Sequence, residues 1–211
     1  MKTRPSGTPL IGVLALQGDF AEHVAVLTRL GARTREVRLP EQIEGLDGLI
    51  IPGGESTTIA RLIARWALLE PVRRRAREGM AVWGTCAGAI LLAERTADLD
   101  REGLRLMDIA VERNAFGRQV DSFEATLDVP ALGPAPYPAV FIRAPKITDV
   151  GPRAETLARL ADGTVVAARQ GRLLATAFHP ELTDDARFHE YFLSLTNREE
   201  RSPAPTAAET G

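Results

Sequence analysis

Residues 81–88 of the chain read Ala81-Val82-Trp83-Gly84-Thr85-Cys86-Ala87-Gly88. An apolar run that ends at a glycine and turns at once into a helix start is typical of the elbow that presents a catalytic nucleophile, here with sulfur in place of oxygen. The glycines on both sides of Cys86 permit the tight turn, and the dipoles of the following helix favour the thiolate. A lone cysteine is more often a buried structural residue. The elbow context nevertheless favours Cys86 as a nucleophile.

The order of strand, loop and helix at this elbow also occurs twice earlier in the chain. In each case a mainly apolar run is broken by glycine and followed by apolar residues at helical spacing. Near-continuous apolar strands that alternate with helices predict an α/β fold with a mostly parallel central sheet flanked by helices. Reactive groups of such sheets gather where the strands end, at the carboxyl edge. The expected strands are 10–16, 48–51 and 80–83, the helices 20–30, 57–69 and 87–93, and the loops 17–18, 52–56 and 84–88.

The middle of the chain has a different pattern, because its apolar runs are separated by turns without long helices. A partly antiparallel section is therefore expected there. Two later runs on either side of Gln170-Gly171 predict a hairpin, and an amphipathic helix closes the domain. The expected strands are 104–111, 122–127, 139–142, 164–168 and 172–178, and the closing helix is 184–195.

Composition narrows the class of protein. The 211 residues are 45% hydrophobic and 26% charged, which fits one globular domain over 10–197, with a flexible extension over 1–9 and a disordered tail over 198–211. With 26 basic and 28 acidic residues, the charge balance of the chain gives no reason to expect binding to nucleic acid phosphates or an anionic membrane. No run reaches membrane-spanning length, and one cysteine excludes an internal disulfide or a cysteine-rich zinc site. These features predict a cytoplasmic enzyme without a metal or cofactor.

A thiol nucleophile needs a base, and the chain has three histidines. His179 follows the apolar strand 172–178, and Glu181 stands two residues further on, where it can orient the ring. His-Pro-Glu alone would be an ordinary turn, but together with the cysteine elbow it supplies the leading base. His23 and His189 lie on the first and last expected helices, where surface or helix-packing roles are expected.

Other residues offer weaker signals. The adjacent glycines in Pro52-Gly53-Gly54-Glu55-Ser56 can point backbone amides at a developing oxyanion, and they also suit a tight turn with Ser56 or Thr57 as a helix cap. Arg113 and Arg143 stand in less polar surroundings. An arginine can clamp a carboxylate with its fork of donors, although most arginines are solvated. Spacing alone leaves both arginines undecided.

Taken together, these segments resemble the glutaminase subunit of pyridoxal 5'-phosphate synthase, a triad-type class I glutamine amidotransferase with a flavodoxin-like fold. The resemblance covers residues 10–196. The cysteine elbow and His-Pro-Glu are shared by many triad amidotransferases, whereas the Gly-Gly-Glu-Ser stretch (53–56) and the Arg-Asn-Ala-Phe-Gly-Arg-Gln stretch (113–119) point to this subfamily. The matching stretches are Ile11 to Gly18, Pro52-Gly53-Gly54-Glu55-Ser56-Thr57-Thr58, Gly84 to Gly88, Arg113-Asn114-Ala115-Phe116-Gly117-Arg118-Gln119, Phe141 to Pro145 and Phe178 to Leu182.

The resemblance implies a catalytic triad and a partner. Cys86, His179 and Glu181 would form the triad, and the backbone amides of Gly54 and Ala87 would hold the oxyanion. The partner would be a synthase subunit in a hetero-oligomeric complex, which combines the ammonia with ribose 5-phosphate and glyceraldehyde 3-phosphate. The substrate L-glutamine would be held by Gly54, Glu55, Ser56, Arg113, Ile142 and Arg143.

Two other functions remain open on the sequence. A cysteine hydrolase of the same fold could cut gamma-glutamyl peptides without a partner. A non-catalytic regulator or redox sensor could use Cys86 as a reversible oxidation site, and it would not need the pair of His179 and Glu181.

Overall fold

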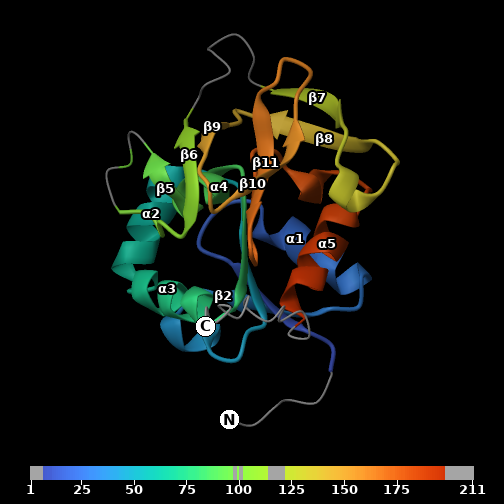
Figure 1. The fold of residues 1–211 in the computed structure, drawn as a ribbon. Coiled ribbons are helices and arrows are strands. Elements are labelled where there is room, and N and C mark those ends of the chain that lie inside the picture. Colours follow the sequence, from blue (N-terminus) through green and yellow to red (C-terminus); the bar gives the residue numbers. More distant parts are fainter. Residues whose placement is uncertain (1–6, 97–98, 100–101, 114–121, 198–211) are drawn as a thin grey trace, which may run out of the picture.

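The computed structural model describes residues 7–96, 99, 102–113 and 122–197 (Figure 1). The expected disordered tail and most of the expected N-terminal extension lie outside these residues. The same holds for Asn114 to Gln119 of the stretch that begins at Arg113.

A ten-stranded sheet forms the centre of the fold, in the order β2-β1-β3-β4-β12-β11-β9-β6-β5, with β10 paired to β11. Its first five strands are mutually parallel, and β11, β9 and β6 then continue it in antiparallel fashion. Both the mostly parallel section and the partly antiparallel section were expected. The strands are β1 (Leu10–Leu14), β2 (Arg33–Val37), β3 (Gly48–Ile51), β4 (Ala81–Thr85), β5 (Ala93–Thr96), β6 (Met107–Glu112), β9 (Lys146–Val150), β10 (Glu155–Arg159), β11 (Val165–Gln170) and β12 (Leu173–Thr176).

Helices cover both faces of this sheet (Figure 1). One face carries α2 (Ser56–Arg65), α3 (Leu69–Arg77) and α4 (Ala87–Leu92). The other carries α1 (Phe20–Arg29), α5 (Arg187–Thr196) and a hairpin of β7 (Ser122–Leu127) and β8 (Tyr137–Ile142). Three short 3₁₀ turns complete the described elements: η1 (Pro40–Ile43), η2 (Pro130–Leu132) and η3 (Pro180–Leu182).

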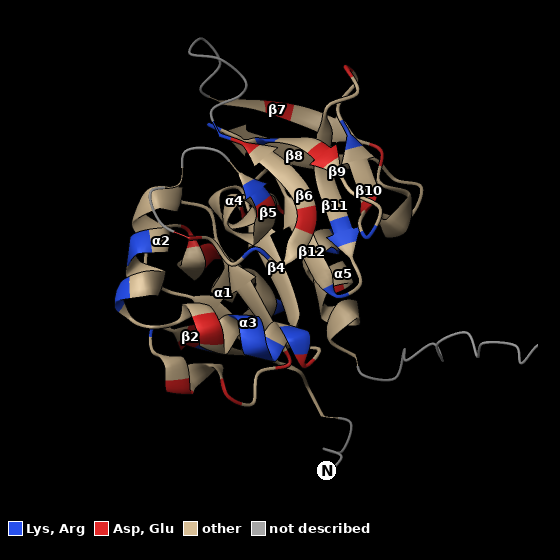
Figure 2. Cartoon of the chain, turned by 60° about the vertical axis from the view of Figure 1, so that its left-hand side comes forward, with Lys and Arg blue, Asp and Glu red and all other residues tan. Residues whose placement is uncertain are grey.

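The central strands are apolar throughout because both of their faces are buried. In β4, Val82 packs on the α2 side while Trp83 packs on the α5 side, and both are fully buried. Basic residues are prominent on α3 (Figure 2). Among the described helices, none has both the length and the apolar content needed to cross a membrane.

Some boundaries differ from the prediction. The helix expected over 57–69 ends at Arg65, because Ala67 takes a left-handed conformation (φ 54°) and a separate helix, α3, begins at Leu69. The last strand ends at Thr176 rather than at residue 178. The closing helix begins at Arg187 rather than at residue 184. The sequence prediction missed β2, β5, β9 and β10, which are short and carry charged residues at partly exposed positions.

The loops that follow β1, β3 and β4 meet at the carboxyl edge of the sheet, as expected. A side chain on Gly18 would overlap the carbonyl of Gly53, and one on Gly88 would overlap the carbonyl of Ile51. The backbone N–H of Asp19 donates to the Gly53 carbonyl oxygen at 3.3 Å. The three loops therefore pack on one another without intervening side chains.

Candidate active site

Cys86 stands at a strained elbow between β4 and α4. Its backbone has φ 46° and ψ −104°, a conformation that L residues rarely adopt and that clusters at functional sites. A side chain on Gly84 would overlap the backbone of Gly88, so the close approach of the two flanking positions requires glycine. The Cys86 N–H donates to the Thr176 carbonyl oxygen at 2.8 Å, which ties the elbow to β12. The expected elbow geometry is confirmed.

His179 lies on the segment that leaves β12, the strand beside β4. Its backbone N–H donates to the Val140 carbonyl oxygen at 2.8 Å, and its ring Nδ1 lies 2.7 Å from Glu181 Oε1. His179 is 4% exposed and Glu181 is 6% exposed, so the bond between them is shielded from water. The proline between them starts the turn η3, which folds the carboxylate back onto the ring.

The electrostatics of the site favour a protonated His179. Burial lowers the pKa of His179, but hydrogen bonds with Asp19, Cys86 and Glu181 outweigh burial and raise its pKa above the ordinary value. Burial also raises the pKa of Glu181, an effect that the bond to His179 offsets in part. The thiol of Cys86 is thus hydrogen-bonded to an imidazole that readily keeps a proton.

Asp19 is a second carboxylate at the same ring nitrogen, and the sequence prediction did not include it. Its Oδ2 lies 3.4 Å from His179 Nδ1, and its side chain is 40% exposed. The hydrogen bond to His179 lowers the pKa of Asp19. Asp19 follows Gln17-Gly18 in a loop that reads only as a turn, so no local signal marked it.

Asp19, His179 and Glu181 also satisfy the spacing of a metal-ligand set, since one ligand atom from each lies within 4.8 Å of the others. The His179 nitrogen in this set already bonds to Glu181 at 2.7 Å. An imidazole hydrogen-bonded to two carboxylates accounts for all three groups. No metal is needed to explain the arrangement.

The loop 52–56 lies directly against the His179 ring. A side chain on Gly53 would overlap that ring, and Gly54 has φ 147°. Gln17 Oε1 accepts the backbone N–H of Glu55 at 2.8 Å and so ties the loop to the one after β1. The two adjacent glycines are therefore required by close packing as well as by the turn.

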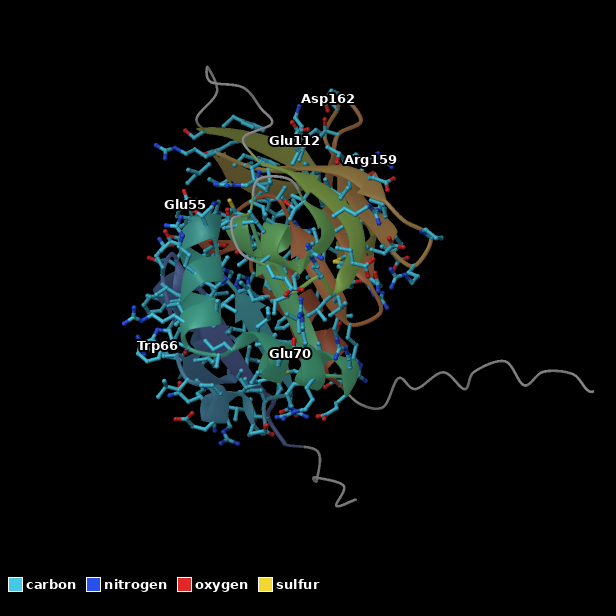
Figure 3. The ribbon with its side chains drawn as sticks, turned by 90° about the vertical axis from the view of Figure 1, so that its left-hand side faces the viewer. Glu55, Trp66, Glu70, Glu112, Arg159 and Asp162 are labelled. Atoms are coloured by element: carbon cyan, nitrogen blue, oxygen red, sulfur yellow. The ribbon has the colours of Figure 1, made fainter. Side chains whose placement is uncertain are left out.

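Four of the six expected substrate-binding residues fall into two pairs. Glu55 lies at the start of α2 (Figure 3), and its Oε1 lies 3.0 Å from Arg113 Nη2. The carbonyl oxygen of Ile142 accepts the Cys86 thiol at 3.8 Å, and the exposed Arg143 follows it with φ 45°. The structure therefore places Ile142 beside the thiol and joins Arg113 to Glu55. Ser56, in contrast, is 3% exposed at the first residue of α2.

The other two histidines are not surface residues. His23 and His189 are both fully buried, and their rings touch each other and Trp83. The expectation of a surface position is wrong for both, and the alternative of helix packing is confirmed. The position of His23 next to the carboxylate of Glu181 was not predicted.

A sheet of this topology with a cysteine elbow, a histidine and a glutamate at its carboxyl edge defines the class I glutamine amidotransferase type. A family model described as "SNO glutamine amidotransferase family" matches residues 13–198. The chain belongs to this family.

Curated relatives agree with the family match. The chain is 65% identical over 188 residues to a protein of Herpetosiphon aurantiacus named "Pyridoxal 5'-phosphate synthase subunit PdxT", covering 88% of this chain and 99% of the relative. It is 58% identical to the protein of the same name from Chloroflexus aurantiacus, over the same shares of the two chains.

Solved structures agree as well. One titled "Crystal structure of glutamine amidotransferase" has a TM-score of 0.83 at 52% identity and covers 88% of this chain and 98% of its own. A structure of PurLQS from Thermotoga maritima has a TM-score of 0.68 at 14% identity and covers 90% of this chain and 100% of its own; it shares the fold.

Proposed function

We propose that this chain is the glutaminase subunit of a pyridoxal 5'-phosphate synthase, hydrolysing L-glutamine to L-glutamate and ammonia. The observation that carries the proposal is the buried 2.7 Å bond between His179 and Glu181 beside the elbow cysteine. In an acyl transfer, Cys86 is the nucleophile, His179 the base and Glu181 the group that orients the base. Membership of the glutamine amidotransferase family supports the same assignment.

The reaction proceeds in two halves. Cys86 gives its proton to His179 and its sulfur attacks the carboxamide carbon of glutamine. The protonated His179 then donates to the departing nitrogen, the C–N bond breaks, and ammonia leaves a thioester on Cys86. In the second half His179 takes a proton from water and the resulting hydroxide attacks the thioester. The C–S bond then breaks, His179 returns the proton to the sulfur of Cys86, and glutamate is released.

The oxyanion of each half-reaction needs backbone donors. We assign this role to the amides of Gly54 and Ala87. Support comes from the packing of Gly53 against the His179 ring, which brings loop 52–56 to the reacting groups, and from the position of Ala87 directly after the nucleophile.

Glutamine carries an amino and a carboxylate group, so its site should offer charges of both signs. Glu55 and Arg113 form such a pair, and Arg143, which follows the residue whose carbonyl oxygen contacts the thiol, would supply a second cation. Gly54, Ser56 and Ile142 would line the same site, Ser56 through its backbone since its side chain is buried. These residues remain proposals for substrate binding.

The relatives' name indicates where the ammonia goes. They are named as subunits of pyridoxal 5'-phosphate synthase, so we propose a hetero-oligomeric complex in which a synthase subunit receives the ammonia. Direct transfer is chemically sensible, since ammonia released into bulk water would be protonated and diluted. No comparison favours a stand-alone gamma-glutamyl hydrolase or a redox sensor, and a sensor leaves the His179–Glu181 bond unexplained. The expected cytoplasmic location stays a prediction.

The test is ammonia release from glutamine, measured with and without a candidate synthase subunit, using Cys86→Ala as the blank. Gamma-glutamyl peptides form a parallel arm. We expect glutamine to be turned over and the gamma-glutamyl peptides not to be. Turnover of the peptides that equals that of glutamine, in the absence of the synthase subunit, would support the hydrolase instead. Ammonia release that is the same in the Cys86→Ala protein would exclude the proposed mechanism.

Control by the partner is a further prediction. A glutaminase running without its synthase would waste glutamine, so a resting state with an unproductive amide in loop 52–56 is expected. Docking of the synthase subunit would favour the productive orientation, because Gly53 and Gly54 change backbone conformation at low steric cost. Stepwise addition of the synthase subunit, with glutamine saturating, should raise glutamate production. Full activity before any addition would refute this control.

A further inference from the structure

A second pair of buried side chains lies behind Glu181, on the side away from His179. His23 of α1 and His189 of α5 are both fully buried, and His23 Nδ1 lies 3.0 Å from His189 Nε2. The other nitrogen of His23, Nε2, lies 3.3 Å from Glu181 Oε2 and 3.3 Å from Thr85 Oγ1. Contacts therefore run from His189 through His23 to Glu181 and on to the ring of His179.

The carboxylate of Glu181 needs such a neighbour. Its Oε1 is bonded to His179, but its Oε2 is buried and has no hydrogen-bond partner within the described part of the chain. A buried carboxylate oxygen left unpaired is costly, because it has lost water without gaining a donor. His23 Nε2, at 3.3 Å, is placed to supply the N–H by a small rotation of its ring.

Hydrogen-bond chemistry selects one tautomer for each histidine. If His23 carries its proton on Nε2, it offers a donor to Glu181, and its Nδ1 accepts from His189 Nε2–H. The opposite choice would turn a nitrogen lone pair toward the carboxylate. It would also leave a buried N–H at His189 Nδ1, which has no partner in the described structure.

Both rings stay neutral in this arrangement. Burial, reinforced by the positive charge of His179, holds the pKa of His23 well below its ordinary value. Burial likewise lowers the pKa of His189 to about 3. A neutral His23 can donate to Glu181 without competing, as a second cation, with the imidazolium of His179. Besides these histidines, the titratable groups that act on Glu181 are Asp19 and Tyr137.

We propose that His23, held in its Nε2–H tautomer by His189, is a positioning residue that fixes the carboxylate of Glu181 for its bond to His179. This proposal rests on the proposed glutaminase function. His23 touches neither substrate nor reacting atoms, so its effect passes through the orientation and charge of Glu181. The carboxylate is then held by both oxygens through both half-reactions, and the ring of His179 keeps one orientation.

The first test measures the histidine tautomers of the wild-type protein, and variants serve only to assign the spectra. The chain has three histidines, so ¹⁵N spectra of the wild-type imidazoles can be assigned with single His-to-Gln changes. We expect His23 and His189 both to be neutral Nε2–H tautomers from about pH 6 to pH 8. A proton on Nδ1 of His23, or a cationic His23, overturns the proposal whatever the enzyme's activity.

The second test is kinetic, in the presence of the synthase subunit. His23→Leu removes the donor, and we expect kcat to fall about ten- to hundredfold with KM for glutamine nearly unchanged, as for loss of a bond to a charged group. His23→Gln can place an amide N–H near the position of Nε2 and should restore most of kcat. The acidic limb of the kcat profile should move to higher pH in His23→Leu, because Glu181 loses a donor that favours its charged form.

Phe192→Leu is the matched control. Phe192 is fully buried on α5 and packs on Trp83 at 5.5 Å between ring centroids, but it makes no polar contact with the carboxylate. The Phe192→Leu variant should have a lower melting temperature than the wild type, with the same kcat and the same pH profile. Equal kcat and pH profiles for wild type, His23→Leu and His23→Gln would show that the histidine pair only packs the core, and the proposal would be wrong.

The two hypotheses can fail separately. A wild-type protein that releases no ammonia with its synthase subunit refutes the proposed function, and the tautomer measurement still decides on His23. If His23→Leu does not fold, the tautomers and the retained kcat of His23→Gln decide together. A loss of kcat in His23→Gln as large as that of Cys86→Ala contradicts a positioning role.

Discussion

Exchanging Glu181 for glutamine should be less damaging here than in a triad with a single carboxylate. In a Ser-His-Asp triad, an amide in place of the orienting acid lowers kcat by about 10⁴, because the base takes the wrong tautomer. In this chain Asp19 Oδ2 lies 3.4 Å from the same nitrogen of His179. A negative charge therefore still faces His179 Nδ1 in the Glu181→Gln protein.

The size of the rescue follows from that distance. A carboxylate and an imidazolium 3.4 Å apart attract by about 5 kcal/mol at an effective dielectric constant of about 20. Asp19 is 40% exposed, so screening by water reduces this to about 1–2 kcal/mol. That energy corresponds to about five- to thirtyfold in rate. Dividing the loss of about 10⁴ by this rescue, we expect Glu181→Gln to lower kcat by about 300- to 2000-fold.

A double-mutant cycle measures the rescue directly. Asp19→Asn alone should lower kcat less than about threefold, since Glu181 still orients the ring, whereas the double variant should approach the full loss of about 10⁴. The assay is glutamate production with glutamine and the synthase subunit both saturating, with melting curves to confirm folding. If Asp19→Asn costs nothing further in the Glu181→Gln background, Asp19 does not support the base and the reasoning is refuted.

Other variants test the remaining roles. Cys86→Ala should abolish turnover with the fold intact, and His179→Ala should be nearly as damaging since the two act as a unit; a greater loss in His189→Ala than in His179→Ala would show that the wrong base was chosen. Arg113→Ala and Arg143→Ala should each raise the half-saturating glutamine concentration, and no change in either would remove its binding role. Burial lowers the pKa of His189 from 6.5 to about 3, so the unfolded chain binds a proton that the folded chain excludes between these values. Stability should therefore fall as pH drops from about 6.5, by up to about 1.4 kcal/mol per pH unit for this group. His189→Phe should flatten that slope in pH-dependent urea unfolding, and an unchanged slope would count against a buried neutral ring.

The sequence predicted those parts of the site that depend on local geometry. The Cys86 elbow is encoded within a few residues, since glycines at 84 and 88 are needed where the backbone passes closest. His179 could be chosen from three histidines because it follows an apolar strand, and Glu181 because it stands two residues further on. Strands with both faces buried could also be predicted. The expected strand 48–51 coincides with β3 (Gly48–Ile51).

Elements at the edges of the fold were harder to predict. The strand β2 reads Arg-Thr-Arg-Glu-Val and buries only Val37, because it is an edge strand with solvent at most positions. The helix α3 carries arginines in its last turn and buries only Val72, so its apolar stripe is too narrow to stand out. The left-handed turn at Ala67 could not be predicted, because an alanine and not a glycine takes the positive φ there.

The partners of the triad carboxylate could not be read from the chain, because they arise only from tertiary packing. His23 is separated from Glu181 by most of the sequence, and it reaches the carboxylate only because α1 and α5 pack on the same face of the sheet as Trp83. Each histidine by itself looks like an ordinary helix residue. A pair of buried imidazoles would destabilise the core relative to apolar side chains of similar volume, because apolar side chains need no hydrogen bonds. Their cost is understandable if the carboxylate beside them has to remain charged and fixed in water-free surroundings, and the tautomer of His23 is the property that decides this.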